Sequence, residues 1–116
     1  MATWDDVGKI ASRLPEVTPG QAHEGSPAYD VKGKQFARLR WDDGREILQF
    51  WSNEGRDALV RAKPEAYWVV KAFPSAVFAW LDRLDATELD EIVTDSWLAR
   101  APKRLVKANP DVGLRH

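Results

Sequence analysis

The stretch AYDVKGKQFARLRWDDGREILQFW, residues 28–51, contains three apolar-rich segments separated by two turn signals. In the first turn, Gly33 follows Lys32 and can adopt the positive φ that a tight hairpin turn often needs. In the second turn, Gly44 follows Asp43, and this dipeptide is a strong hairpin signal. The sequence therefore predicts a meander of three antiparallel strands, over residues 28–31, 34–41 and 47–51.

Side chains of the second strand are expected to alternate between the two faces of the sheet. The alternation forms two groups, which are Ala37, Leu39 and Trp41 on one face and Phe36, Arg38 and Arg40 on the other. Because the second group mixes an aromatic ring with two cations, we expect this face to be half-exposed. Part of the aromatic content of the chain, which includes six Trp, then lies on that face.

A helix is predicted before the meander. Thr3 and Asp6 have the spacing of a capping box, and apolar residues at helical spacing follow them. We expect this helix to run over residues 4–14 and to end at Pro15. The next segment, PEVTPGQAHEGSP over residues 15–27, contains Pro, Gly and Ser and is expected to be an irregular connection.

The region after the meander is expected to hold a short helix and two more strands. Asn53 is a suitable N-cap for a helix through residues 58–62, and Pro64 would end it. The segments AYWVV and SAVFAWL, residues 66–70 and 75–81, have the composition of strands.

Two helices are expected at the C-terminal end. Asp85 and Glu88 repeat the capping signature before a strong amphipathic helix. The expected buried stripe of this helix comprises Leu89, Ile92, Val93, Ser96 and Trp97. Pro102 falls where it would open a separate short helix over residues 102–108.

These elements predict an α+β fold: one domain over residues 1–116, with an antiparallel sheet of about five strands and helices packed largely on one face. The apolar content of 44% and the charged content of 30% are typical of a globular protein. The sequence contains no Cys and no run of 18 apolar residues, and its first residues carry acids where a signal peptide has positive charge. A cytoplasmic location is the expectation.

The charged residues are unevenly distributed. The net charge of −1 and the pI of about 6.1 argue against a protein whose whole surface is a polycation for nucleic acid. However, residues 31–40 carry four cations and no acid, residues 85–97 carry five acids and no cation, and residues 98–116 carry five cations and one acid. Basic patches of this kind can attract a polyanion even when the total charge is close to zero.

Three motifs resemble those of a known family. TWDDVGKIASRLPEV resembles the opening of the MmcQ/YjbR-like family, SPAYDVKGKQFARL resembles its first hairpin, and WLARAPKRLVKA resembles its C-terminal end. The resemblance covers the chain from about Thr3 to Ala108. It implies an antiparallel sheet covered by helices. It also implies DNA binding through a double wing, in which β-hairpins contact the duplex.

Carried over to this chain, the resemblance places one wing at each turn of the meander. The first wing has Lys32 and Lys34 at its tip, with Arg38 and Arg40 on the following strand. The second wing turns at residues 42–45 and offers Arg45. Here the sequence departs from a good wing, because Asp42 and Asp43 would face the phosphates and offset Arg45.

A second basic set, Arg100, Lys103, Arg104 and Lys107, has helical spacing near the C-terminal end. These residues are candidates for a row of phosphate contacts. Cations near a helix C-terminus also stabilise the helix dipole and keep the surface soluble, so both interpretations stay open. A third possibility is an aromatic face or groove of the sheet that binds a small molecule or a protein. The aromatic candidates for it are Trp41, Trp51, Trp68, Trp80 and Trp97.

No catalytic, cofactor or metal-binding pattern is found in the sequence. His23 and His116 are the only histidines, and neither has a second nitrogen or sulfur ligand nearby in sequence. The Ser residues lack the context of a nucleophile elbow. We therefore expect a non-enzymatic binding protein without metal or cofactor. Its expected partner is DNA, bound weakly and largely independently of sequence.

Overall fold

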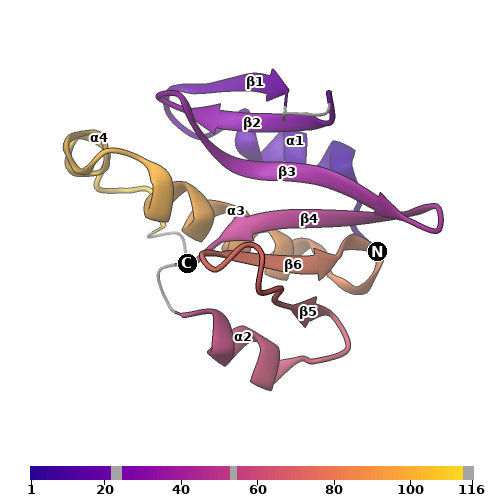
Figure 1. Ribbon diagram of the computed structural model, residues 1–116. Coiled ribbons are helices and arrows are strands. Elements are labelled where there is room, and N and C mark those ends of the chain that lie inside the picture. The colour runs from indigo at the N-terminus through magenta and orange to yellow at the C-terminus, as the bar shows by residue number, and fades with distance from the viewer. Residues whose placement is uncertain (22–24, 53–54, 114–116) are drawn as a thin grey trace.

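The predicted meander forms the centre of a six-stranded antiparallel sheet in a computed structural model, which describes residues 1–21, 25–52 and 55–113 (Figure 1). The strands are β1 (Val17–Gln21), β2 (Pro27–Val31), β3 (Lys34–Asp42), β4 (Arg45–Trp51), β5 (Tyr67–Trp68) and β6 (Ala76–Trp80). Their order across the sheet is β1-β2-β3-β4-β6-β5. The meander prediction is confirmed, but the sheet has six strands rather than about five.

The helices gather mainly behind one face of the sheet. They are α1 (Trp4–Ala11), α2 (Arg56–Ala62), the 3-10 helix η1 (Leu81–Arg83), α3 (Ala86–Arg100) and α4 (Lys103–Ala108). In Figure 1, α1 and α3 lie behind β2, β3 and β4, whereas α2 lies beyond the edge strand β5. The predicted α+β class is confirmed, with a single domain built around one main core. Within the part of the chain that the structure describes, no helix is long and apolar enough to cross a membrane.

The segment after α1 is a strand, contrary to the prediction of an irregular connection over residues 15–27. Val17 pairs with Val31, and the antiparallel register continues to Gln21 opposite Pro27. An edge strand tolerates Pro19, because the missing N–H there breaks no ladder on the outer side. At Gly20, a Cβ atom would lie 2.7 Å from Asp30 Oδ2, so a larger residue here would displace the Asp30 carboxylate.

A bulge in β3 changes the predicted division of its side chains. The register shifts between Tyr29 and Asp30, which pair with Ala37 and Gln35, so Phe36 is the extra residue. Phe36 is fully buried in the main core together with Ala37. The prediction that Phe36 shares a face with Arg38 and Arg40 is therefore wrong, since strict alternation fails at a bulge.

The predicted stripe of α3 is confirmed. All five of its residues are buried: Leu89, Ile92, Val93, Ser96 and Trp97. Trp97 is fully buried, and its Nε1 donates a hydrogen bond of 3.0 Å to the backbone oxygen of Pro15. Ser96 connects α3 to the sheet, because its Oγ donates to the backbone oxygen of Phe36 and accepts from the backbone N–H of Trp51.

Capping residues set the starts of two helices as predicted. Thr3 and Asp6 form a capping box, and the Asp85 carboxylate accepts from the backbone N–H of Glu88 at 2.8 Å. The first helix ends at Ala11 instead of residue 14, and the last one begins at Lys103 after Pro102. The predicted N-cap Asn53 lies outside the described residues, and α2 begins after Gly55.

Candidate nucleic-acid interface

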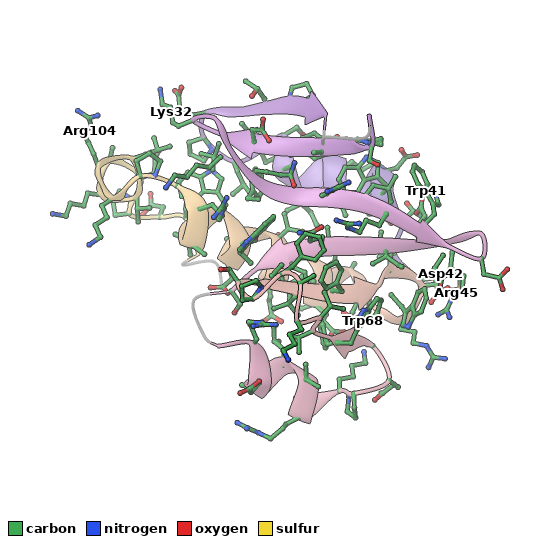
Figure 2. All side chains as sticks on the ribbon, in the orientation of Figure 1. Lys32, Trp41, Asp42, Arg45, Trp68 and Arg104 are labelled. Atoms are coloured by element: carbon green, nitrogen blue, oxygen red, sulfur yellow. The ribbon has the colours of Figure 1, made fainter. Side chains whose placement is uncertain are left out.

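Two basic segments lie at the same end of the sheet. The turn between β2 and β3 exposes Lys32 and Lys34, and α4 exposes Lys103, Arg104 and Lys107. Figure 2 shows Lys32 and Arg104 at the same end of the molecule. We refer to these five residues as the basic end.

Arg100 holds the C-terminal end of α3 against the start of β3. Its Nε donates a hydrogen bond of 2.8 Å to the backbone oxygen of Gln35, and its guanidinium carbon lies 4.6 Å from the centroid of the Trp51 ring. Because α4 follows α3 after two residues, this anchor brings α4 to the end of the sheet where β3 begins. Leu105 and Val106 pack against the main core, which leaves the three cations of α4 on its exposed side.

The tip of the first hairpin has the geometry of a two-residue type I′ turn. Lys32 and Gly33 have φ values of 49° and 81°, as such a turn requires at both central positions. Lys32 Nζ lies 3.2 Å from Glu16 Oε1, and about half of each side chain is exposed. Exposed ion pairs of this kind are weak and screened by salt, so Lys32 can exchange Glu16 for another anion.

The second hairpin lies at the opposite end of the sheet, as the positions of Asp42 and Arg45 in Figure 2 show. Asp43 and Gly44 have φ values of 53° and 78°, so this turn has the same geometry as the first. Both guanidinium contacts of Arg45 to Asp82 measure 2.8 Å, in a bidentate ion pair. The two predicted wings therefore do not lie side by side, and Arg45 already has a carboxylate partner.

Electrostatics at this second turn follow from the ion pair. The hydrogen bond from Arg45 lowers the pKa of the Asp82 carboxyl below its ordinary value, and the same hydrogen bond raises the pKa of Arg45. The Arg45 guanidinium carbon also lies 3.8 Å from the centroid of the Trp80 ring. A stacked, bidentate guanidinium is held in one orientation by the protein itself.

Arg38 and Arg40 lie on the face of the sheet opposite to α1 and α3. Only 9% of Arg38 is exposed. The Nε of Arg40 donates to Gln49 Oε1 at 2.7 Å, and its guanidinium carbon lies 5.0 Å from the centroid of the Phe73 ring. These two arginines lie on one face of β3, as the sequence predicted, and their side chains contact the sheet surface rather than the tip of the hairpin.

This face carries part of the aromatic content of the chain, as the sequence predicted for a half-exposed side. We call it the open face, made of Arg38, Arg40, Arg45, Ile47, Gln49, Trp51, Trp68, Ala76, Phe78 and Trp80. The ring centroid of Trp68 lies 5.9 Å from that of Phe78 and 4.9 Å from that of Trp80. Sequence reasoning missed the pairing of arginines with these rings. The alternation along β4 was the sequence signal for it, because every second residue from Arg45 to Trp51 lies on this face.

Two of the aromatic candidates lie elsewhere. Trp97 belongs to the main core. Trp41 pairs in register with Glu46, whose carboxylate accepts from the backbone N–H of Trp4 in α1, so Trp41 extends from the helix-covered side of the sheet. It is 55% exposed, at the end opposite to the basic end (Figure 2).

An acid-lined cavity of about 590 Å³ lies along α3, next to α2. In its lining, the Tyr67 hydroxyl donates to Glu88 Oε2 at 2.6 Å. Glu88 Oε1 also lies 2.9 Å from Lys63 Nζ, which is not part of the lining. Burial and then the hydrogen bond to Glu88 raise the pKa of Tyr67 well above its usual range. The hydrogen bond to Glu88 likewise raises the pKa of Lys63. Glu91 and Asp95 add negative charge to the same lining, which disfavours a polyanion there.

Metal ligation finds no support in the part of the chain that the structure describes, since no group of three or more His, Asp or Glu there could hold an ion. The two histidines considered from the sequence, His23 and His116, lie outside the described residues.

Comparison with known proteins places the chain in a family. The YjbR family model matches residues 12–99. Uncharacterised proteins of Mycobacterium tuberculosis and Mycobacterium bovis are each 31% identical over 127 residues, which span 93% of this chain and 95% of theirs. No solved structure matches this chain. With a family match over most of its length, and relatives that align almost end to end, the chain belongs to the YjbR family.

Proposed function

We propose that this protein is a non-enzymatic nucleic-acid-binding protein and that its basic end contacts the phosphate backbone of DNA. The observation that carries the proposal is that two exposed basic segments, far apart in the sequence, lie at the same end of the sheet. The resemblance to family members labelled as DNA-binding adds support by analogy. The acid-lined cavity along α3 makes that side of the molecule a poor alternative for a polyanion.

The chemistry of the basic end suits phosphate contacts. Lys and Arg at a phosphate backbone release condensed counterions, which favours binding at low salt. The five side chains are exposed at a turn tip and on a short helix, without a helix or strand shaped to enter a groove and read base edges. We therefore expect weak binding that is largely independent of sequence.

The proposed footprint is narrower than the set of cations considered from the sequence. Arg100 acts by positioning α4, because it bonds to Gln35 and stacks on Trp51. Arg45 is held by Asp82 at the opposite end. Lys32, Lys34, Lys103, Arg104 and Lys107 remain as the phosphate contacts.

A binding function also suits the titratable groups of the acid-lined cavity along α3. The Tyr67 hydroxyl has a raised pKa, and Glu88, its partner, is shared with Lys63. A protonated hydroxyl bonded to a paired carboxylate serves packing and burial rather than proton transfer near neutral pH.

The test is a salt titration of binding to labelled DNA, both as a duplex and as a single strand. With about five phosphate contacts, the plot of log affinity against log salt should have a slope of about −4 to −5 on duplex DNA. Fluorescence anisotropy at low ionic strength measures it. If the protein shows no salt-sensitive binding to DNA or RNA in either form, the proposed function is wrong.

A further inference from the structure

The open face combines aromatic rings and arginines on a side of the sheet that the proposed phosphate contacts leave unused. In Figure 1, β3 and β4 lie in front of α1 and α3, and none of the described helices covers them on the near side. A small apolar cluster on this face has three buried residues at its bottom, Ile47, Ala76 and Phe78. Trp51, Trp68 and Trp80 are only partly buried above it.

Exposed aromatic surface continues from this cluster into the connection between β5 and β6. Phe73 is 39% exposed, and its ring packs edge-on against Phe78 with centroids 5.9 Å apart. Trp68 projects in front of the sheet in Figure 2. The rings of Trp68 and Phe73 thus flank Phe78, which leaves a partly exposed aromatic strip.

We propose that the open face, together with the neighbouring Phe73, binds single-stranded nucleic acid by stacking bases on Trp51, Trp68 and Phe73. This inference rests on the proposed function, because the basic end would hold phosphates of the same strand. It specifies that the protein binds single-stranded nucleic acid in preference to a duplex.

Charge complementarity supports a nucleic-acid strand as the occupant. Arginine guanidinium groups lie against two of the rings proposed to stack bases: Arg100 on Trp51 and Arg40 on Phe73. Surfaces that bind single strands combine cations for the backbone with rings for the bases, and bases also stack on guanidinium planes.

The open face is also continuous with the basic end. Trp51 ends β4 at the side where β3 begins, and the Arg100 that stacks on it comes three residues before Lys103 in α4. From Trp51, the strip extends along β4 to Ile47, which pairs with Trp80. At about 3.4 Å per residue, this path is about 14 Å long. Sheet faces in other single-strand-binding domains hold two or three stacked bases.

The geometry favours a single strand over a duplex. In a duplex the faces of the bases are stacked on one another, and a protein in a groove meets only their edges. The half-buried rings of the open face offer flat surfaces rather than a helix or wing that could enter a groove. Unstacked bases of a single strand can use such surfaces with little sequence preference.

The test uses the full chain and two fluorescein-labelled probes of about 15 nucleotides, an oligo-dT strand and a mixed-sequence duplex. Trp68→Leu removes a ring from the open face, and Trp41→Leu is the matched control on the other side of the sheet. Phe73→Ser is a second variant, at an exposed position whose change leaves the main core intact. Thermal melting confirms that each variant is folded.

We expect the unmodified protein to bind the single strand at least about tenfold more tightly than the duplex. Trp68→Leu and Phe73→Ser should each weaken single-strand binding by about fivefold or more, while duplex binding and the Trp41→Leu control stay unchanged. Equal binding of strand and duplex, or wild-type affinity in both open-face variants, would overturn the inference and leave the proposed function standing. Absence of binding to either probe would overturn both.

Discussion

The two turns at opposite ends of β3 have the same backbone geometry, but their cations differ in what they contact. At the basic end, Lys32 has a half-exposed ion pair with Glu16. At the other end, Arg45 is fixed by a bidentate pair with Asp82 and by the Trp80 ring. A cation on a hairpin is thus a candidate phosphate ligand only where no carboxylate of the protein already holds it in a bidentate ion pair.

The largest effect on stability is expected in the main core, against which the strands of both turns pack. Trp97→Ala removes a fully buried ring and its hydrogen bond to Pro15, so it should lower the free energy of unfolding by about 3–5 kcal/mol. Thermal or urea unfolding measures the change. If the variant melts like the parent, the assignment of Trp97 to the core is wrong.

The next effect separates the two segments of the basic end. Lys32→Glu with Lys34→Glu should weaken DNA binding by about tenfold, because a turn tip can follow a phosphate backbone. Lys103→Glu with Arg104→Glu should weaken it less, since cations on α4 also have a local role in solubility. Anisotropy at one low salt concentration compares the pairs, and a larger loss in the α4 variant would reverse this ranking. Neither pair should change stability by more than about 0.5 kcal/mol.

A smaller effect is expected at the opposite turn. Asp82→Asn removes the carboxylate that fixes Arg45, which should lower the melting temperature slightly at neutral pH and leave DNA binding unchanged. Because the folded-state pKa of Asp82 lies below its ordinary value of 3.8, its contribution is present above about pH 4 and is lost as the pH falls through the lowered value.

Melting curves of the parent and the Asp82→Asn variant should therefore converge below about pH 4. If the difference in melting temperature between parent and variant stays constant down to about pH 2, the ion pair is not the cause of that difference. A marked loss of DNA affinity in this variant would place the second turn in the interface after all.

The smallest effect concerns Glu16, the partner of Lys32. Glu16→Gln removes an anion beside the turn tip, so DNA affinity at low salt should rise by about twofold, with little change in stability. The same titration as above detects it. A lower affinity would mean that Glu16 orients Lys32 for binding rather than competing with the phosphate.

Local signals were sufficient to predict much of the fold. Gly33 and Gly44 marked both turns of the meander, and Asp85 marked the start of α3. The edge strand β1 was missed because Pro19 and Gly20 indicate a loop, and only pairing with β2 makes them a strand. The bulge at Phe36 depends on the register with β2, which local alternation does not encode.

The candidate site was predictable as a set of cations but not as a surface. Whether Arg45 and Arg100 are exposed or stacked depends on Asp82, Gln35 and Trp51, which lie far from them in the sequence. The juxtaposition of α4 with the first hairpin likewise depends on tertiary packing, through the Arg100 anchor. Charge counts along the sequence carry no information on these partners.

The most direct test of the central claim compares salt dependence in two variants of equal net charge. Lys32→Glu with Lys34→Glu changes the basic end, and Arg61→Glu with Arg83→Glu makes the same change at exposed positions on α2 and η1. On duplex DNA at neutral pH, the first variant should flatten the log–log salt slope by about 1.8, at about 0.9 per lost contact, and the second should leave it unchanged. Equal flattening in both variants would contradict a localised basic end, because binding would then follow net charge alone.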